Sequence, residues 1–266
     1  MRGPWANRGV STCQRSDAEV IRATTSLAAF SRLLLLSLQR APLIGFDALG
    51  AMPCVMNDDG LWLEFGVYRG NTISRISKFR NKTRLVRGPT YGFDSFMGLP
   101  QEWRPPSAGC VAHCRRGAFS LHGSPPFAAD GTVLQWVIGW FNETLPAFVA
   151  SHPQGHVSFL HVDSDLYSSA ATIFETLGPS WLRPGAVVVF DELFNYRGFI
   201  DHEMRALWEF LRRVPHLGIE VLGSSTHSIL LKPERDVHPQ SAALRLVRIH
   251  PNRTRGSRVR PHRRAE

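Results

Sequence analysis

Two pairs of acidic residues stand at the ends of short apolar runs and are the residues best suited to chemistry. Asp163 and Asp165 follow one run, and Asp191 and Glu192 follow another. Carboxylate oxygens are the ligands that hard divalent cations such as Mg²⁺ prefer. Four carboxylates that meet in one place repel one another unless a cation or a proton intervenes. The two pairs therefore predict a divalent metal site, provided that the fold brings them together.

The apolar runs themselves predict how these acids are positioned. Residues 157–162 and 186–190 are short, largely apolar and bounded by turn signals, which is typical of strands buried on both faces of a parallel sheet. Ligands bind such sheets at the carboxyl ends of the strands. We therefore expect the four carboxylates on one rim. The two-residue spacing of Asp163 and Asp165 would point both side chains to the same side of the sheet.

A third expected strand, near residues 61–65, runs into a glycine turn. Gly66 and Gly70 allow backbone angles that other residues avoid, so the chain can pass close to a ligand. The helix expected at about 71–80 would direct its N-terminal amides at that ligand. Glu64, within the strand, either orients a cofactor through this turn or caps the following helix.

The next expected strand, near residues 90–94, ends in Asp94. An acid in this position commonly binds the ribose hydroxyls of a nucleotide-type cofactor. The alternative is that Asp94 starts a local turn together with Ser95.

Strands and helices alternate through the central part of the chain, which favours an α/β fold with a doubly wound sheet. Another strand is expected at 134–139 and helices at 141–151, 168–177 and 199–213. A strand pair at 219–222 and 228–231 would close the domain. The long connection 97–127 is rich in Pro and Gly and is expected to be a loop over the substrate, because long connections in compact domains are usually functional.

Composition divides the chain into three parts. Residues 1–57 predict an N-terminal extension with one helix, from Asp17 to Gln39 after Ser16 as N-cap, and residues 58–240 the enzyme domain. Residues 241–266 hold eight arginines and one glutamate, so this tail accounts for most of the formal charge of +9 and is expected to be disordered. Because the remaining body is nearly neutral, we expect no specific nucleic-acid partner.

The four cysteines, Cys13, Cys54, Cys110 and Cys114, do not form a dense disulfide framework, and we expect the loop of Cys110 and Cys114 to hold reduced thiols. Cys110, His113 and Cys114 lack a second ligand pair at zinc-site spacing. No apolar stretch reaches the roughly 20 residues that span a bilayer. We expect a cytoplasmic protein, with an organellar transit peptide as the alternative because the first forty residues are rich in arginine.

The motifs, taken in order, resemble one known family: the class I S-adenosylmethionine-dependent methyltransferases, and among them the macrocin O-methyltransferase group. The resemblance covers roughly residues 58–232, and the acidic string followed by FDE is its most specific part. The matching strings are LEFGVYRGNT (63–72), YGFDSFMGLP (91–100), GWFNETLP (139–146), HVDSDLYSSA (161–170) and VVVFDELFNYRGF (187–199).

The resemblance implies a fold and a cofactor. The fold would be a Rossmann-like, doubly wound, mostly parallel sheet with an antiparallel terminal strand pair. The cofactor would be S-adenosyl-L-methionine, bound at the turn of Glu64, Gly66 and Gly70 with Asp94 on the ribose. Gly139 and Trp140 would lie at the adenine pocket, although Trp140 is equally consistent with ordinary packing.

The resemblance also implies a divalent metal, usually Mg²⁺. Asp163 and Asp191 would hold it together with Glu192, and Asp165 would accept the proton of the acceptor hydroxyl. An alternative role for Asp165 is to cap the helix that begins near Ser168. The better-known sugar methyltransferases of the group have two adjacent aspartates where this chain has Asp191 and Glu192.

The expected function is therefore O-methylation of a small-molecule acceptor, a sugar hydroxyl or a glycosylated natural product. The alternative is a non-catalytic protein that binds a nucleotide-type ligand on the same fold. A nicotinamide-dependent oxidoreductase is disfavoured because the G-x-G-x-x-G fingerprint is absent. A homo-oligomer is left open.

Overall fold

The computed structural model describes residue 13 and residues 19–55, 60–83, 88–104 and 112–249. Seven strands form one sheet in the order β3-β2-β1-β4-β5-β7-β6. The first five are parallel, and β7 is antiparallel to both β5 and β6, so the fold class predicted from the sequence is confirmed. The strands are β1 Leu61–Phe65, β2 Thr90–Asp94, β3 Leu134–Ile138, β4 Val157–Val162, β5 Val187–Phe190, β6 Leu217–Ser224 and β7 Ala242–Arg248.

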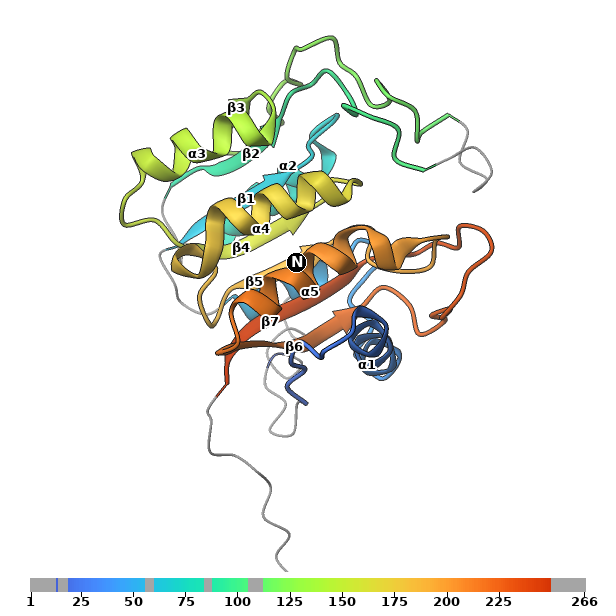
Figure 1. Cartoon of the computed structure of the whole chain (residues 1–266). Helices are drawn as coiled ribbons and strands as arrows, with labels where there is room; N and C mark the ends of the chain where they lie inside the picture. Colours follow the sequence, from blue (N-terminus) through green and yellow to red (C-terminus); the bar gives the residue numbers. More distant parts are fainter. Residues whose placement is uncertain (1–12, 14–18, 56–59, 84–87, 105–111, 250–266) are drawn as a thin grey trace, which may run out of the picture.

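Helices cover both faces of the sheet. Figure 1 shows α3, α4 and α5 side by side in front of the sheet, and α2 behind it. Helix α1 lies beside β6, at the edge of the sheet. The helices are α1 Leu27–Gln39, α2 Asn71–Thr83, α3 Phe141–Ser151, α4 Tyr167–Trp181 and α5 Glu203–Arg213, with short 3-10 helices η1 Leu49–Cys54 and η3 Phe199–Asp201.

Alternating side chains of the strands divide the core into two layers. In β5, Val188 and Phe190 join the larger apolar cluster under α1, α3, α4 and α5. Val187 and Val189 join a smaller cluster on the opposite face, with η1 and part of α2. Both faces of β5 are therefore buried, as its continuous apolar run predicts.

The C-terminal boundary expected from the sequence is wrong. Residues 228–231 form no strand, and the last strand is β7, which lies within the segment expected to be a disordered tail. Its sequence, Ala242 to Arg248, buries its first three residues and then alternates. Arg245 is held by an ion pair with Glu220, so this arginine belongs to the sheet and not to a solvated tail. The domain extends at least to Arg248, and residues 250–266 lie outside the described residues.

The N-terminal helix begins later than the sequence predicts. Helix α1 starts at Leu27, where the Ser26 hydroxyl accepts a hydrogen bond from the Ala29 amide. Ile21 instead pairs with Ile219 of β6, so this part of the chain is extended. The predicted N-cap, Ser16, lies outside the described residues. Within the described ranges, no helix is long and apolar enough to cross a membrane.

The expectation of reduced thiols in the loop of Cys110 and Cys114 is wrong, and the structure holds a disulfide that the sequence did not predict. Cys13 and Cys54, 41 residues apart in the sequence, form a disulfide, and Cys114 is also disulfide-bonded. Both members of the first pair are buried in the smaller apolar cluster, against the strand face that includes Val187 and Val189. The long separation in sequence gives no local signal of this pairing.

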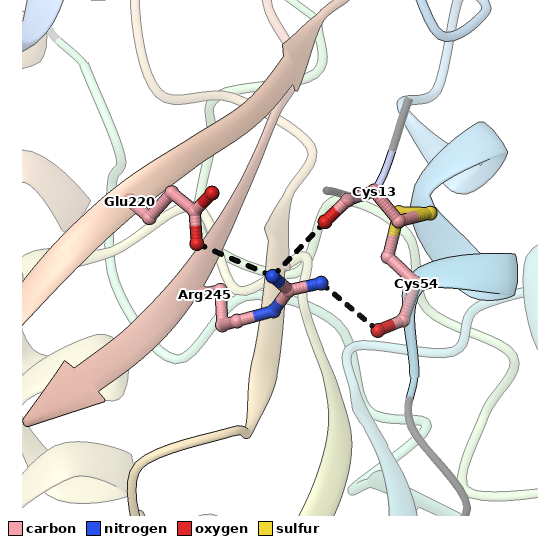
Figure 2. The surroundings of a disulfide bond; sticks show 4 residues. All are labelled: Cys13, Cys54, Glu220 and Arg245. Carbon is pink, nitrogen blue, oxygen red and sulfur yellow. Dashed lines mark hydrogen bonds and ion pairs between the residues drawn. A yellow bond between two sulfur atoms is a disulfide. The ribbon is translucent and has the colours of Figure 1, made fainter. Parts of the chain in front are cut away.

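A half-buried arginine links this disulfide to the sheet (Figure 2). Arg245 of β7 donates from Nη1 to the Cys13 carbonyl and from Nη2 to the Cys54 carbonyl, each at 3.2 Å. Its Nη1 also lies 3.2 Å from a carboxylate oxygen of Glu220. The N-terminal extension is thus anchored to β6 and β7 through its two half-cystines.

Candidate active site

A cavity of about 570 Å³ opens at the carboxyl ends of the parallel strands. The loops after β1, β2, β4 and β5 form its walls, because parallel strands present these ends at the same edge. Gly66 and Asp94 also line it. The four acids singled out in the sequence all line it: Asp163, Asp165, Asp191 and Glu192.

Three of these acids form a cluster suited to a cation. Asp163, Asp191 and Glu192 each offer a carboxylate oxygen within 4.8 Å of the others. Burial raises the pKa of Asp163 and of Glu192 well above the usual range, and the charge of Asp191 raises both further. One oxygen of Glu192 is buried without a hydrogen-bond partner among the described residues. An all-carboxylate set that disfavours its own charge fits a hard divalent cation such as Mg²⁺.

Asp165 lies beside this cluster but outside it. It is 8% exposed and adopts a left-handed backbone conformation, with φ of 59°. Burial raises the pKa of Asp165 to about 7, with smaller contributions from Asp191 and Asp94, while Arg104 opposes the shift. Helix α4 begins at Tyr167 without a side-chain cap, so the structure does not show the capping role.

The glycine turn packs against the acidic cluster. Gly66 has φ of 89°, and a Cβ atom there would overlap the carbonyl oxygen of Asp163. The close approach that requires glycine is therefore to the Asp163 backbone, whereas the sequence suggested a ligand. Gly70 also has a positive φ, of 75°, but it does not line the cavity.

Asp94 holds the same turn from the neighbouring strand. Its Oδ2 accepts hydrogen bonds from the amides of Val67 at 2.8 Å and Tyr68 at 3.0 Å. Its Oδ1 accepts from the Phe96 amide at 2.7 Å. The first two bonds hold the glycine turn, and the third closes a local turn across Ser95, the alternative role that the sequence left open. A carboxylate has about four acceptor positions, so the side chain still has capacity for a ligand hydroxyl.

Glu64 does not line the cavity. Its side chain is fully buried, and its Oε1 is 3.0 Å from Nδ1 of His161 on β4. Burial raises the pKa of Glu64, and the His161 contact opposes that effect. This pairing favours a role in which Glu64 supports the glycine turn and does not contact a cofactor directly.

Of the two residues that the sequence analysis expected at an adenine pocket, only one lines the cavity. Trp140, at the start of α3, lines the cavity. Gly139 does not line it. Its amide donates to the Asp94 carbonyl at 3.0 Å, which joins the ends of β2 and β3.

Sequence analysis missed Arg104, a buried cation on the long loop. Arg104 is 4% exposed, and its Nη1 lies 2.6 Å from Oδ1 of Asp236. Its guanidinium also stacks over Trp103 and Tyr196. The signal available was an arginine in a loop expected to cover an acidic site.

Glu203 and Ser241 were also missed. Oε1 of Glu203 accepts hydrogen bonds from the Ser164 amide and hydroxyl. Ser241 lies with its hydroxyl 3.4 Å from Oδ1 of Asp191 and 3.1 Å from the Phe46 carbonyl. The signal for Glu203 was present, because it stands four residues before Leu207 on the expected apolar stripe of its helix.

Residues 63–193 match the profile of a family described as Methyltransferase domain. The matched range begins in β1 and ends just after Glu192, so it contains the glycine turn and all four cavity acids. A search of curated proteins found no match.

Three solved structures are similar to this chain. The structure of CalS11, a calicheamicin methyltransferase, aligns with a TM-score of 0.52 and 20% identity over 87% of this chain and 98% of that chain. An apo structure of CalS11, described as a TDP-rhamnose 3'-O-methyltransferase, aligns at 0.47 and 22% over 83% of each. The O-methyltransferase NovP aligns at 0.46 and 19% over 81% of this chain and 80% of that chain. The first similarity establishes a shared fold and nothing further.

Proposed function

We propose that this protein transfers a methyl group from S-adenosylmethionine to a hydroxyl oxygen of a small molecule, with a divalent cation bound in the active site. The observation that carries the proposal is the cluster of Asp163, Asp191 and Glu192 beside Asp165, in a cavity that also holds the glycine turn. The match to a methyltransferase domain over this region supports it. A bare binding scaffold has no reason to gather four carboxylates, which disfavours the non-catalytic alternative.

The cofactor would bind at the turn of Gly66 to Gly70. Asp94, already fixed by backbone amides, would accept the ribose hydroxyls through its remaining acceptor position. Trp140 would face the adenine from the start of α3. Glu64 and Gly139 would keep the turn and the β3 end in place without touching the cofactor.

The cation would be held by Asp163, Asp191 and Glu192, and when bound it supplies a Lewis acid that lowers the pKa of an acceptor hydroxyl. Asp165 lines the same cavity and would accept the proton of that hydroxyl. The walls of the cavity would align the acceptor oxygen with the methyl group, and such alignment supplies much of the acceleration in group transfer.

The acceptor class and the family are part of the proposal. The sequence motifs favour the macrocin O-methyltransferase group and hence a sugar hydroxyl, free or on a glycosylated natural product. Leu99, Pro100 and Phe119 of the long loop line the cavity with Tyr68, so this loop would contact the acceptor.

A two-stage experiment tests the function. Calorimetry should first detect binding of S-adenosylmethionine and of S-adenosylhomocysteine to the full-length protein. A screen of nucleotide sugars and glycosides with Mg²⁺ should then detect release of S-adenosylhomocysteine. Failure to bind either compound would refute the cofactor assignment. Binding without turnover on any acceptor would favour the non-catalytic alternative.

The compartment is a separate proposal. The sequence favoured the cytoplasm, where glutathione and thioredoxin keep thiols reduced. The Cys13–Cys54 disulfide and the disulfide-bonded Cys114 favour an oxidising compartment instead. Alkylation of the protein in freshly lysed native cells, followed by mass spectrometry, tests this. Alkylated Cys13 and Cys54 in the non-reduced sample would refute it.

A further inference from the structure

We propose that Glu203 is a positioning residue that fixes the Asp163–Ser164–Asp165 turn and so aims both acids into the cavity. The inference rests on the proposed function for its consequence, because Asp163 is a proposed ligand of the cation and Asp165 the proposed base. Glu203 itself does not line the cavity.

The contact is a double hydrogen bond from one residue to one oxygen. Glu203 is the first residue of α5 and is fully buried. Its Oε1 lies 3.3 Å from the Ser164 amide nitrogen and 3.2 Å from the Ser164 hydroxyl. Ser164 is itself 6% exposed and stands between the two acids. Both donors of the central residue of the turn are therefore held by a carboxyl group from another element.

The turn needs such support because its backbone is strained. Asp165 has φ of 59°, and a residue other than glycine keeps this conformation only where its surroundings determine it. On one side, the Asp163 amide donates to the Phe65 carbonyl, and Gly66 packs against the Asp163 carbonyl. The link from Ser164 to Glu203 holds the turn from the side of α5.

Stability alone gives a poor account of Glu203. Its second oxygen is buried with no hydrogen-bond partner among the described residues, which costs free energy. Burial raises its pKa well above the usual range, although the Ser164 bonds oppose this. Its neighbours on the helix, Met204 and Leu207, are buried apolar residues, so an apolar side chain would also fit the stripe. The hydrogen bonds to Ser164 therefore explain why an acidic residue stands at this buried position.

Two substitutions separate the acceptor oxygen from the carboxyl group. Glu203→Gln keeps an oxygen that accepts from both Ser164 donors, whereas Glu203→Leu removes it at similar volume. Glu209→Gln on the same helix is the control, because Glu209 accepts from the side chains of Tyr167 and Arg205 and not from Ser164. Ser164→Ala removes one of the two bonds and serves as a milder variant if Glu203→Leu does not fold.

Two measurements on the full-length protein decide the inference. The first is Mn²⁺ affinity by electron paramagnetic resonance, with the metal alone as probe. Glu203→Leu should weaken it by about 10–100-fold, the usual effect of losing an outer-shell partner, while Glu203→Gln stays within about threefold of the unsubstituted protein. The second is hydrogen exchange of the 163–166 backbone, which should accelerate at least about tenfold in Glu203→Leu and remain slow in Glu203→Gln.

The outcomes are distinguishable. Slow exchange at the turn in Glu203→Leu would overturn the inference, as would unchanged Mn²⁺ affinity in that variant. Equal loss in Glu203→Gln and Glu203→Leu would also overturn it, because the acceptor oxygen would then not be the cause. If the unsubstituted protein binds no Mn²⁺, the metal part of the proposed function fails, and the exchange measurement still decides the role of Glu203.

Discussion

The carbonyl oxygen of Asp163 lies only 1.7 Å from the position that a Cβ atom of residue 66 would take, so Gly66 and Asp163 pack this closely only because residue 66 has no side chain. The turn proposed for the cofactor and the first ligand proposed for the cation thus share a backbone contact. A substitution at Gly66 or Asp163 should therefore weaken binding at both proposed sites.

Gly66→Ala tests this shared contact. The added methyl group would displace Asp163, and alanine also disfavours the φ of 89° that this position requires. We expect weaker binding of S-adenosylmethionine and of Mn²⁺, each by about tenfold or more, because strained positions typically cost about 1–3 kcal/mol. Calorimetry with each ligand measures both. Loss of cofactor binding with unchanged Mn²⁺ affinity would contradict the shared contact.

Asp94→Ala should weaken cofactor binding through the turn and through the ribose. The substitution leaves the amides of Val67, Tyr68 and Phe96 without their acceptor. We expect a loss of about 1–3 kcal/mol in the binding free energy of S-adenosylmethionine, measured by calorimetry. Comparison with a 2'-deoxy analogue of S-adenosylmethionine isolates the contribution of the ribose hydroxyl to the binding free energy. An analogue that binds as tightly as the natural cofactor to the unsubstituted protein would refute the ribose contact.

The disulfide should contribute measurably to stability. A double Cys13→Ser, Cys54→Ser variant opens a loop of 41 residues and leaves Cys114 and its bond intact. We expect a decrease of about 2–4 kcal/mol in the free energy of unfolding, measured by urea denaturation. Arg245→Leu, which removes the hydrogen bonds to the two half-cystine carbonyls, should decrease stability further. A variant as stable as the unsubstituted protein would show that the extension is held without this bond.

The acidic cluster should make the metal-free protein sensitive to pH. Burial raises the pKa of Asp165 to about 7 and the pKa values of Asp163 and Glu192 well above the usual range. Groups whose pKa is higher in the folded state contribute full stability below the unfolded value, about 4, and lose it as pH rises through the folded value. In EDTA we therefore expect the melting temperature to fall between about pH 4 and about pH 7.

Added Mg²⁺ should reverse this loss, because a bound cation favours the ionised carboxylates. The increase in melting temperature on adding Mg²⁺ should be larger at pH 8 than at pH 5, as measured by scanning calorimetry. The same increase at both pH values would argue against a cation at the cluster.

Local patterns predicted most of what surrounds the cavity. The strands 61–65, 90–94 and 157–162 were predicted at their observed bounds, because each is a short buried run with a polar or glycine end. Parallel packing then brings their carboxyl ends together without any long-range information. The glycine turn and the cavity acids follow from the same rule.

The features that were missed depend on contacts far apart in the chain. The arginine-rich composition after residue 240 predicted a disordered tail where the structure has β7. Arg245 of β7 forms an ion pair with Glu220 of β6. The Cys13–Cys54 bond and the contact of Ser164 with Glu203 join segments that no local pattern connects. In each case a charged or reactive side chain is explained by a partner that only the folded chain supplies.

Asp165→Asn addresses the chemical step most directly. The amide keeps the size of the side chain and an oxygen, but it cannot accept the proton of the acceptor hydroxyl. The capping alternative already lacks support, because α4 begins at Tyr167 with no side-chain cap. With an acceptor identified by the screen, turnover should fall about 10²–10⁴-fold, the usual contribution of a general base.

The binding properties of Asp165→Asn provide the control. Asp165 is outside the group of three acids whose oxygens converge, so Mn²⁺ affinity should fall only modestly, because a nearby charge is lost but no ligand is. Affinity for S-adenosylmethionine and the melting temperature at pH 7.5 should change little. The substitution removes a carboxylate that the neighbouring acids repel, so any change in the melting temperature should be an increase. Together, intact binding and lost turnover would assign the proton transfer to Asp165. Near-normal release of S-adenosylhomocysteine at neutral pH would instead require another base, and loss of Mn²⁺ affinity would make Asp165 part of the cation site.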